Sequence, residues 1–198
     1  MKYRYIAMER EYGSGGRGIA RQTAQAAGIP CYGREILEEA ARNLNLPAVQ
    51  IEDMEEKASN SLMYSLYMVG KMHAGDGDMV SGEGKVYMAE QAVIRDLAAE
   101  GPAIFVGRCA ASALEDKKGV LKVFIHADMP FRVERAVSEY GVDRASAETV
   151  LRRCDKRRAG YYHTCTARKW NDISNYHLIL DSGKLGLEKC AEILAGML

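Results

Sequence analysis

Residues 11–18 read Glu-Tyr-Gly-Ser-Gly-Gly-Arg-Gly, with four glycines among eight residues. The segment follows an apolar run at residues 4–8 and precedes a helical pattern at residues 18–27, so it predicts a glycine-rich turn between a strand and a helix. Such a turn lets several backbone N–H groups converge on one anion, because glycine adopts unusual dihedral angles and admits close approach. The dipole at the start of the following helix adds to the attraction. The stretch therefore predicts a phosphate-binding loop.

The loop departs from the nucleotide-binding pattern G-x-x-x-x-G-K-[ST] at three of its four defined positions. Glu11 replaces the first glycine, Arg17 the lysine, and Gly18 the serine or threonine. Arg17 still supplies a cation that can hold phosphate oxygens in a bidentate manner. The hydroxyl missing at Gly18 is the group that ordinarily ligates magnesium. A tight strand–helix turn without a ligand is the alternative, and the four glycines favour phosphate binding over it. The predicted phosphate-binding residues are Gly13, Ser14, Gly15, Gly16, Arg17 and Gly18.

Length and composition indicate one globular domain. The 198 residues suffice to bury a core, and the formal net charge is zero, so we expect neither nucleic acid nor a membrane as a partner. The five cysteines are scattered without CxxC spacing, which is typical of reduced thiols. Apolar runs stay well short of the ~20 residues of a membrane span, and the N-terminus lacks the apolar region of a signal peptide. We therefore expect a cytoplasmic protein; its oligomeric state is not assigned by the sequence.

Short apolar runs alternate with helical patterns along the chain. We predict strands at residues 4–8, 29–32, 103–107, 121–126 and 176–180. We predict helices at residues 18–27, 35–43, 54–73, 86–100, 130–140, 145–160 and 185–198. The alternation predicts βαβ crossovers and a parallel sheet covered on both faces, hence an α/β fold. Residues 51–84 interrupt it and are interpreted as a helical insertion followed by a mobile loop.

Five stretches together resemble the cytidylate-kinase-like group of P-loop proteins, relatives of the bacterial cytidylate kinases among the nucleoside monophosphate kinases. They are REYGSGGRGIA, GIPCYGREIL, IFVGRCA, DKRRAGYYHTCTARKW and NYHLILDSGKLGLE. The resemblance implies a three-layer α/β/α P-loop NTPase fold with a five-stranded parallel sheet. It also implies a helical, acceptor-binding insertion at residues 48–85 and an arginine-bearing lid at residues 145–172, within a single domain of residues 1–198.

The resemblance further implies acceptor-binding residues. The stretch VGRC at residues 106–109 corresponds to DGRD of true cytidylate kinases, which implies that Arg108 holds the acceptor phosphate. Relatives carry a carboxylate after the tyrosine of the second strand. That position is Gly33 here, beside Arg34 and Glu35, which are therefore predicted to contact the acceptor.

A basic segment lies near the C-terminus, with seven lysines and arginines in residues 152–169. Phosphoryl transfer needs cations that spread the charge of the transferred group and exclude water. At helical spacing Arg153 and Arg157 share one face, and Arg158 lies about a quarter turn away. We predict that these three arginines, together with Arg17, are the catalytic residues.

Two other interpretations of the basic segment compete with a lid. A charge run is often a solvated helix face, and Tyr161, Tyr162 and Trp170 could stack on single-stranded nucleic acid. The neutral net charge argues against nucleic acid. Asp155, Arg158 and the tyrosine pair also match the lid motif of the family that the chain resembles, which favours the lid.

These residues predict transfer of the γ-phosphoryl group of ATP to a small acceptor, with a nucleoside monophosphate such as CMP as first choice. Mg²⁺ would bridge the donor phosphates largely through waters, and Glu11 and Glu35 are the carboxylates nearest to it. Two alternatives stand beside this hypothesis. Gly18 and Val106, where a hydroxyl and a carboxylate are missing, are compatible with a nucleotide-binding module without turnover. The same fold also serves kinases of small metabolites.

Overall fold

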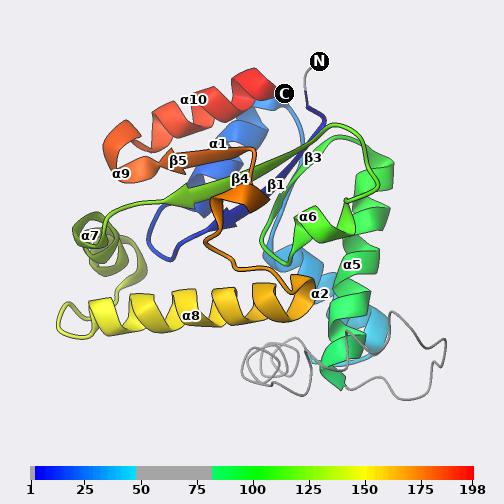
Figure 1. The fold of residues 1–198 in the computed structure, drawn as a ribbon, viewed down its shortest axis with the longest axis horizontal. Coiled ribbons are helices and arrows are strands. Elements are labelled where there is room, and N and C mark those ends of the chain that lie inside the picture. The colour runs from blue at the N-terminus through cyan, green and yellow to red at the C-terminus, as the bar shows by residue number, and fades with distance from the viewer. Residues whose placement is uncertain (1–2, 48–81) are drawn as a thin grey trace.

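The computed structural model describes residues 3–47 and 82–198. In this part of the chain five parallel strands form one sheet in the order β2-β3-β1-β4-β5 (Figure 1). The strands are β1 (Tyr5–Arg10), β2 (Cys31–Tyr32), β3 (Ala103–Val106), β4 (Val120–His126) and β5 (Leu178–Asp181). The predicted strands and their parallel arrangement are confirmed.

Helices flank the sheet and fill the connections between its strands. They are α1 (Gly16–Ala27), α2 (Arg34–Leu44), α5 (Gly82–Glu100), α6 (Ala110–Ala113), α7 (Met129–Tyr140), α8 (Ala147–Thr166), α9 (Ser182–Leu185) and α10 (Leu187–Met197), with a short 3-10 turn at Ile173–Asn175. The helix predicted at residues 54–73, and most of the predicted insertion, lie outside the described residues.

Two predicted helix boundaries are wrong. Helix α8 continues past Gly160 to Thr166, because a single glycine weakens a helix without ending it. The predicted helix at residues 185–198 begins instead at Leu187, because Leu185 is the last residue of a separate helix, α9. Gly186, with φ 81°, stands between α9 and α10 in a backbone conformation outside the helical region.

Local signals mark other helix ends as expected. Gly28 ends α1 in the left-handed conformation, with φ 64°. Asp128 caps α7, because its Oδ1 accepts a hydrogen bond from the N–H of Phe131 at 3.0 Å, and Pro130 lies in the first turn. These caps satisfy backbone groups that the ends of a helix would otherwise leave unpaired.

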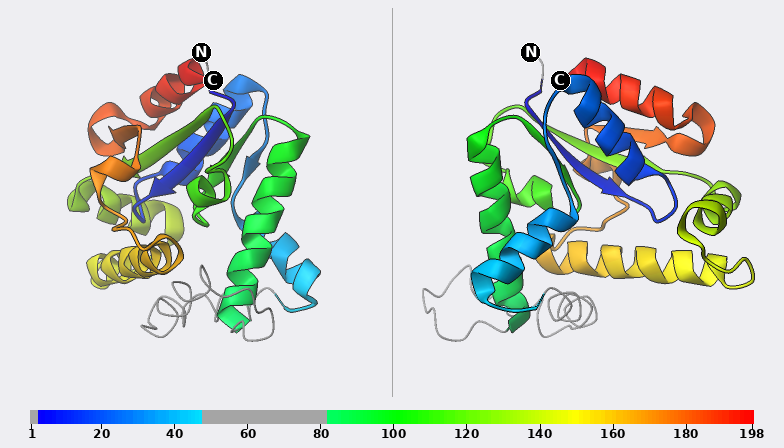
Figure 2. Two further views of the ribbon diagram at one scale, coloured as in Figure 1. Left: turned by 45° about the vertical axis from the view of Figure 1, so that its right-hand side comes forward. Right: turned by 180° about the vertical axis from the view of Figure 1, so that it is seen from behind.

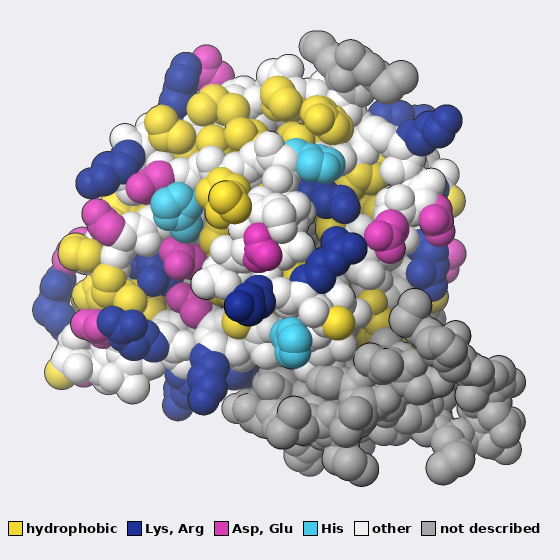
Figure 3. All heavy atoms as spheres, in the orientation of Figure 1, with side chains coloured by type: hydrophobic (Ala, Val, Ile, Leu, Met, Phe, Trp, Pro, Cys, Tyr) yellow, Lys and Arg dark blue, Asp and Glu magenta, His cyan; other side chains and the backbone are white. Residues whose placement is uncertain are grey.

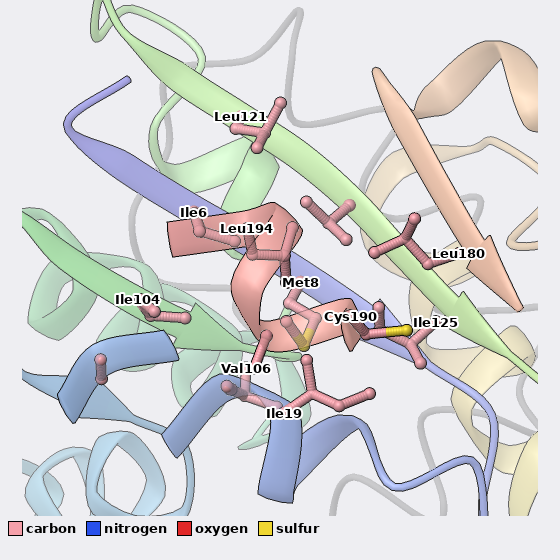
Figure 4. Close-up of a cluster of buried hydrophobic side chains, with 14 residues drawn as sticks. Ile6, Met8, Ile19, Ile104, Val106, Leu121, Ile125, Leu180, Cys190 and Leu194 are labelled. Atoms are coloured by element: carbon pink, nitrogen blue, oxygen red, sulfur yellow. The ribbon is translucent and has the colours of Figure 1, made fainter. Parts of the chain in front are cut away.

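Alternate residues of the central strand face opposite layers. Ile6 and Met8 of β1 belong to a buried cluster with α1 and α10, which lie side by side on one face of the sheet (Figures 2 and 4). Tyr5 and Ala7 belong to a second cluster, with α2, α5 and α6, on the other face. Each fully buried aliphatic side chain contributes about 1.5–3 kcal/mol to folding. Burial on both faces confirms the three-layer α/β/α arrangement.

The carboxyl end of the sheet is where a ligand would bind in such a fold. Strand β1 lies between β3 and β4, and the glycine-rich loop follows it. Helix α8 runs past this end of β1 (Figure 1), where the N–H of Tyr12 donates to Oδ1 of Asp155 at 2.7 Å. The fold therefore brings the predicted loop and the predicted lid together.

On the face shown in Figure 3, basic and acidic side chains are interspersed, in keeping with the net charge of zero. No helix among residues 3–47 and 82–198 is long and apolar enough to cross a membrane. Because the charges on this face are mixed, we looked for a concentration of positive charge in the cavities of the protein.

Candidate functional site

The loop at residues 11–15 joins β1 to α1 and leaves a row of backbone N–H groups without partners. Three of its N–H groups are used within the protein: that of Glu11 donates to the carbonyl oxygen of Ile125 at 3.0 Å, that of Tyr12 to Asp155, and that of Ser14 to the carbonyl oxygen of Glu11 at 3.3 Å. Five others find no acceptor among the described residues, those of Gly13, Gly15, Gly16, Arg17 and Gly18. These N–H groups lie at the start of α1, where the helix dipole favours an anion.

Two positions in the loop require glycine, because of their backbone conformation and because neighbouring atoms pack closely against them. Gly13 and Gly15 have φ angles of 81° and 77°. A Cβ atom on Gly13 would lie 2.7 Å from the carbonyl oxygen of Arg132, and one on Gly15 would lie 2.9 Å from Cδ2 of Leu187. The loop is therefore pressed against α7 and α10, and its shape depends on glycine.

Gly13→Ala is expected to destabilise the protein more than Gly28→Ala. Both residues have positive φ, but no atom lies within 4 Å of a Cβ on Gly28. Left-handed backbone at a non-glycine residue costs about 1–2 kcal/mol at either position. Contact with the Arg132 carbonyl adds about 1–3 kcal/mol at Gly13. Urea denaturation measures both losses, and equal values would show that the loop moves away from α7 at no cost.

Helix α8 is fastened to the loop by a buried cluster of charges. Nη1 of Arg132 donates to Oδ2 of Asp155 at 2.5 Å, and its Nε lies 3.4 Å from Oε2 of Glu11. Burial raises the pKa of Glu11, and Arg132 opposes that shift. Nη1 of Arg158 donates to the carbonyl oxygen of Arg10 at 2.9 Å. The loop and α8 therefore form one unit at the carboxyl end of β1.

A cavity of about 240 Å³ lies beside this unit, and we call it the arginine cavity. Its lining residues come from β1, the loop, the turn after β3 and helix α8: Glu9, Arg10, Tyr12, Arg108, Cys109, Cys154, Arg157, Arg158, Tyr161 and Tyr162. Four of these carry a guanidinium group and one carries a carboxylate. Such an excess of positive charge in a partly enclosed space favours an anionic ligand.

The turn after β3 is strained in a way that is common at binding sites. Gly107, Arg108 and Cys109 have successive φ angles of 78°, 59° and 51°. Left-handed backbone costs about 1–3 kcal/mol at a non-glycine residue and persists only where the surroundings enforce it. Here the N–H of Gly107 donates to the carbonyl oxygen of Met8 at 2.8 Å, and Nε2 of Gln91 donates to the carbonyl oxygen of Arg108 at 3.0 Å. The turn places Arg108 at the wall of the cavity.

Glu90 of α5 lies behind Arg108 and is fully buried. Its Oε1 is 3.3 Å from Nη1 of Arg108, and its Oε2 accepts a hydrogen bond from the hydroxyl of Tyr161 at 2.5 Å. Burial raises the pKa of Glu90 to about 8, while the hydrogen bond from Tyr161 opposes the shift. The sequence analysis missed this residue. The sequence feature that could have revealed it is its spacing: Glu90 lies four residues from both Val86 and Ile94, so it falls on the apolar face of a predicted helix.

The raised pKa of Glu90 predicts a pH-dependent stability that Glu90→Gln removes. The native state keeps a proton that the unfolded chain releases near pH 4.5, so the contribution of Glu90 is present below that pH and is lost as the pH rises to about 8. The free energy of unfolding of the wild type, relative to Glu90→Gln, is expected to fall by an amount on the order of 5 kcal/mol over this range. Urea denaturation at several pH values measures it; a constant difference would contradict the assignment.

Comparisons with known proteins agree with this geometry. The sequence model of the cytidylate kinase-like family matches residues 5–184. The chain belongs to the cytidylate kinase-like family. A comparison with curated proteins gave no match.

Solved structures show the same fold at low sequence identity. An uncharacterized protein from Eubacterium ventriosum superposes with a TM-score of 0.72 at 23% identity, covering 97% of this chain and 96% of its own. TT1252 from Thermus thermophilus gives 0.56 at 14% identity and 100% coverage of both chains. Shikimate kinase from Acinetobacter baumannii, in complex with shikimate, gives 0.51 at 13% identity, covering 97% of this chain and 90% of its own. These similarities support a kinase-like P-loop fold.

Three predicted arginines of this cytidylate kinase-like protein meet at one cavity. Arg108, Arg157 and Arg158 line it, although Arg108 is far from the other two in the sequence. Arg153 lies one turn before Arg157 on α8, is exposed and is not part of the lining. Arg17 is exposed at the start of α1, next to the unpaired amides. Their catalytic roles stay predictions.

The residues predicted at the start of α2 make local contacts. Nε of Arg34 donates to Oε1 of Glu38 at 3.1 Å. Oε2 of Glu35 accepts from the N–H of Gly33 at 2.8 Å. Hydrogen bonds from backbone amides, its own first, lower the pKa of Glu35, and Arg17 lies close enough to add to the shift. Their contact with an acceptor stays a prediction.

The predicted metal carboxylates lie apart. Oε2 of Glu11 accepts from the N–H of Ala127 at 3.2 Å and faces Arg132, whereas Glu35 is exposed at the start of α2. In the described residues, His, Cys, Asp and Glu side chains form no group of three that could hold a metal ion. A magnesium ion would therefore depend on ligands other than a cluster of described side chains.

Proposed function

We propose that this chain transfers the γ-phosphoryl group of ATP to a small phosphorylated acceptor, with a nucleoside monophosphate such as CMP as first candidate. One observation carries the proposal: a row of loop N–H groups, for which the described residues offer no acceptor, lies at the start of α1 next to a cavity lined by four arginines. The amides suit the polyphosphate of a donor, and the cavity suits the anionic group of an acceptor. Membership of a kinase-like family supports the same reaction class.

The roles follow from position and charge. The loop amides, with Arg17, hold the donor phosphates, and Arg108 holds the acceptor phosphate. Arg157 and Arg158 neutralise charge on the transferred group, and Arg153, one turn further along α8, joins them when a ligand is bound. Reactions of this type depend mostly on positioning and charge stabilisation, so the protein need not supply a strong general base.

The loop fits a polyphosphate, but the protein supplies few ligands for Mg²⁺. Oε2 of Glu9 accepts from Nε1 of Trp170 at 3.1 Å, and Glu11 is engaged by Arg132. Gly18 carries no hydroxyl. We infer that Mg²⁺, when bound, would be held largely through waters, with Glu11 and Glu35 as the candidate carboxylates. It would neutralise charge on the donor phosphates.

A nucleotide-binding module without turnover is the second candidate. Gly18 and Val106 favour it, because the general loop pattern has a hydroxyl at the position of Gly18 and true cytidylate kinases have a carboxylate at the position of Val106. A kinase of a small metabolite is a further alternative, since the shikimate kinase has a similar fold.

A coupled assay of ADP formation separates these candidates. Mg²⁺ and ATP are supplied with each common nucleoside monophosphate, and with shikimate and gluconate as phosphate-free acceptors. We expect turnover on at least one monophosphate and none on the phosphate-free compounds. ATP binding without turnover on any acceptor would leave the binding module, turnover on shikimate or gluconate alone would leave the metabolite kinase, and absence of ATP binding would overturn all three.

A further inference from the structure

Arg10, the last residue of β1, occupies a slot that two glycines leave open. A Cβ on Gly16 would lie 2.7 Å from Cβ of Arg10, and a Cβ on Gly107 would collide with its Nη1. Any larger residue at either position would displace the side chain. The slot leads from β1 toward the end of β3, so the guanidinium lies beside the Arg108 turn and faces the arginine cavity.

The charge of Arg10 is poorly compensated by the protein. The nearest carboxylate oxygen, Oε2 of Glu9, is 3.9 Å from Nη1, too far for a hydrogen bond, and that oxygen already accepts from Trp170. Among the described residues no hydrogen-bond acceptor is found for the Arg10 guanidinium. Burial, and next the nearby Arg158, lower the pKa of Arg10 to about 9. An anion in the cavity would relieve this cost.

We propose that Arg10 binds the phosphomonoester dianion of the acceptor in the arginine cavity, together with Arg108. The inference rests on the proposed function and adds a residue that the family pattern did not indicate. The planar guanidinium offers two parallel donors to a phosphate. The direction of the slot assigns the anion to the acceptor and not to the donor. The guanidinium of Arg10 contacts Gly107 at the end of β3, whereas Cβ and Cγ of Arg10 contact Gly16 at the start of α1. The cavity has room for roughly eight water molecules, enough for a phosphate group.

Calorimetric titration with inorganic phosphate, CMP and ATP tests the proposal on the full-length protein. Arg10→Gln is expected to weaken phosphate and CMP binding by about 10- to 100-fold, the loss of charge-assisted hydrogen bonds, with ATP binding changed less than about threefold. Arg10→Lys keeps the positive charge but loses the planar guanidinium, so its affinity for phosphate and CMP should lie between those of the wild type and Arg10→Gln. This variant also tests the proposal if Arg10→Gln does not fold. Arg17→Gln should weaken the binding of ATP and leave the binding of inorganic phosphate in the arginine cavity unchanged.

Arg152→Gln is the matched control, because Arg152 is exposed on α8 and pairs with Glu148 at 2.6 Å outside the cavity. It should match the wild type in every titration. Unchanged phosphate and CMP binding in Arg10→Gln, or the absence of both in the wild type, would overturn the proposal. Weaker ATP binding with unchanged CMP binding would overturn the assignment to the acceptor. Arg10-dependent phosphate binding without turnover in the coupled assay would overturn the proposed function but not this site.

Discussion

Arg108→Lys is expected to lower kcat/KM for phosphoryl transfer by about 10²–10³-fold, a loss typical of removing one well-placed donor from a charge-stabilising site. The lysine keeps the positive charge but loses the planar fork that holds two phosphate oxygens at once. The substitution would also change the contact with Glu90, because Nη1 of Arg108 lies 3.3 Å from Oε1 of Glu90 in the wild type. The assay uses the monophosphate that gives the highest turnover in the coupled assay.

Measuring kcat and KM separately shows whether the loss of kcat/KM in Arg108→Lys comes from acceptor binding or from the chemical step. If Arg108 holds the acceptor phosphate, KM for the acceptor rises while KM for ATP changes little. Arg152→Lys removes the same fork from an exposed ion pair on α8 and is expected to leave kcat/KM within about twofold. A similar small change in Arg108→Lys, with native stability, would contradict the acceptor role.

Arg132→Met is expected to lower the free energy of unfolding by about 3–5 kcal/mol, the usual cost of removing one partner from a buried ion pair. Arg132 is only 5% exposed and contacts both Glu11 and Asp155. Its loss leaves two carboxylates facing each other at the loop. Asp155 would then hold the Tyr12 amide less firmly, so the contact between α8 and the loop would weaken.

Arg144→Met provides the matched control for Arg132→Met. Arg144 pairs with Glu134 at 2.6 Å, but both side chains are more than 60% exposed. Exposed ion pairs contribute about 0–1 kcal/mol, so this variant should unfold almost like the wild type. Urea denaturation followed by circular dichroism measures both variants. Losses of equal size would show that the Arg132 cluster does not stabilise the contact between the loop and α8.

The sequence predicts the sheet well because its signals are local. Apolar runs identify the strands, and glycine or proline marks several helix ends, as at Gly28 and Pro130. The break at Gly186 was missed because an isolated glycine is tolerated within a helical pattern. Helix α6 was missed because its four residues show no periodicity.

The candidate site is only partly predictable, because long-range contacts decide it. The loop was identified from its glycines, and Arg108 from its motif. Arg10 was given no role, and its exposure to the cavity follows from the packing of Gly16 and Gly107 against it. Asp155 was matched to the lid motif, but its bond to the Tyr12 amide spans 143 residues, a pairing that no local pattern predicts.

The account depends on backbone amides of the glycine-rich loop binding a polyphosphate. Amide resonances followed by ¹⁵N–¹H correlation spectra during titration with Mg²⁺ and ATP test this most directly. The unpaired N–H groups of Gly13, Gly15, Gly16, Arg17 and Gly18 should shift downfield together and saturate at one concentration of ATP, while those of Gly28 and Gly141 stay in place. ATP binding that leaves the loop resonances unmoved, or no binding at all, would contradict the account.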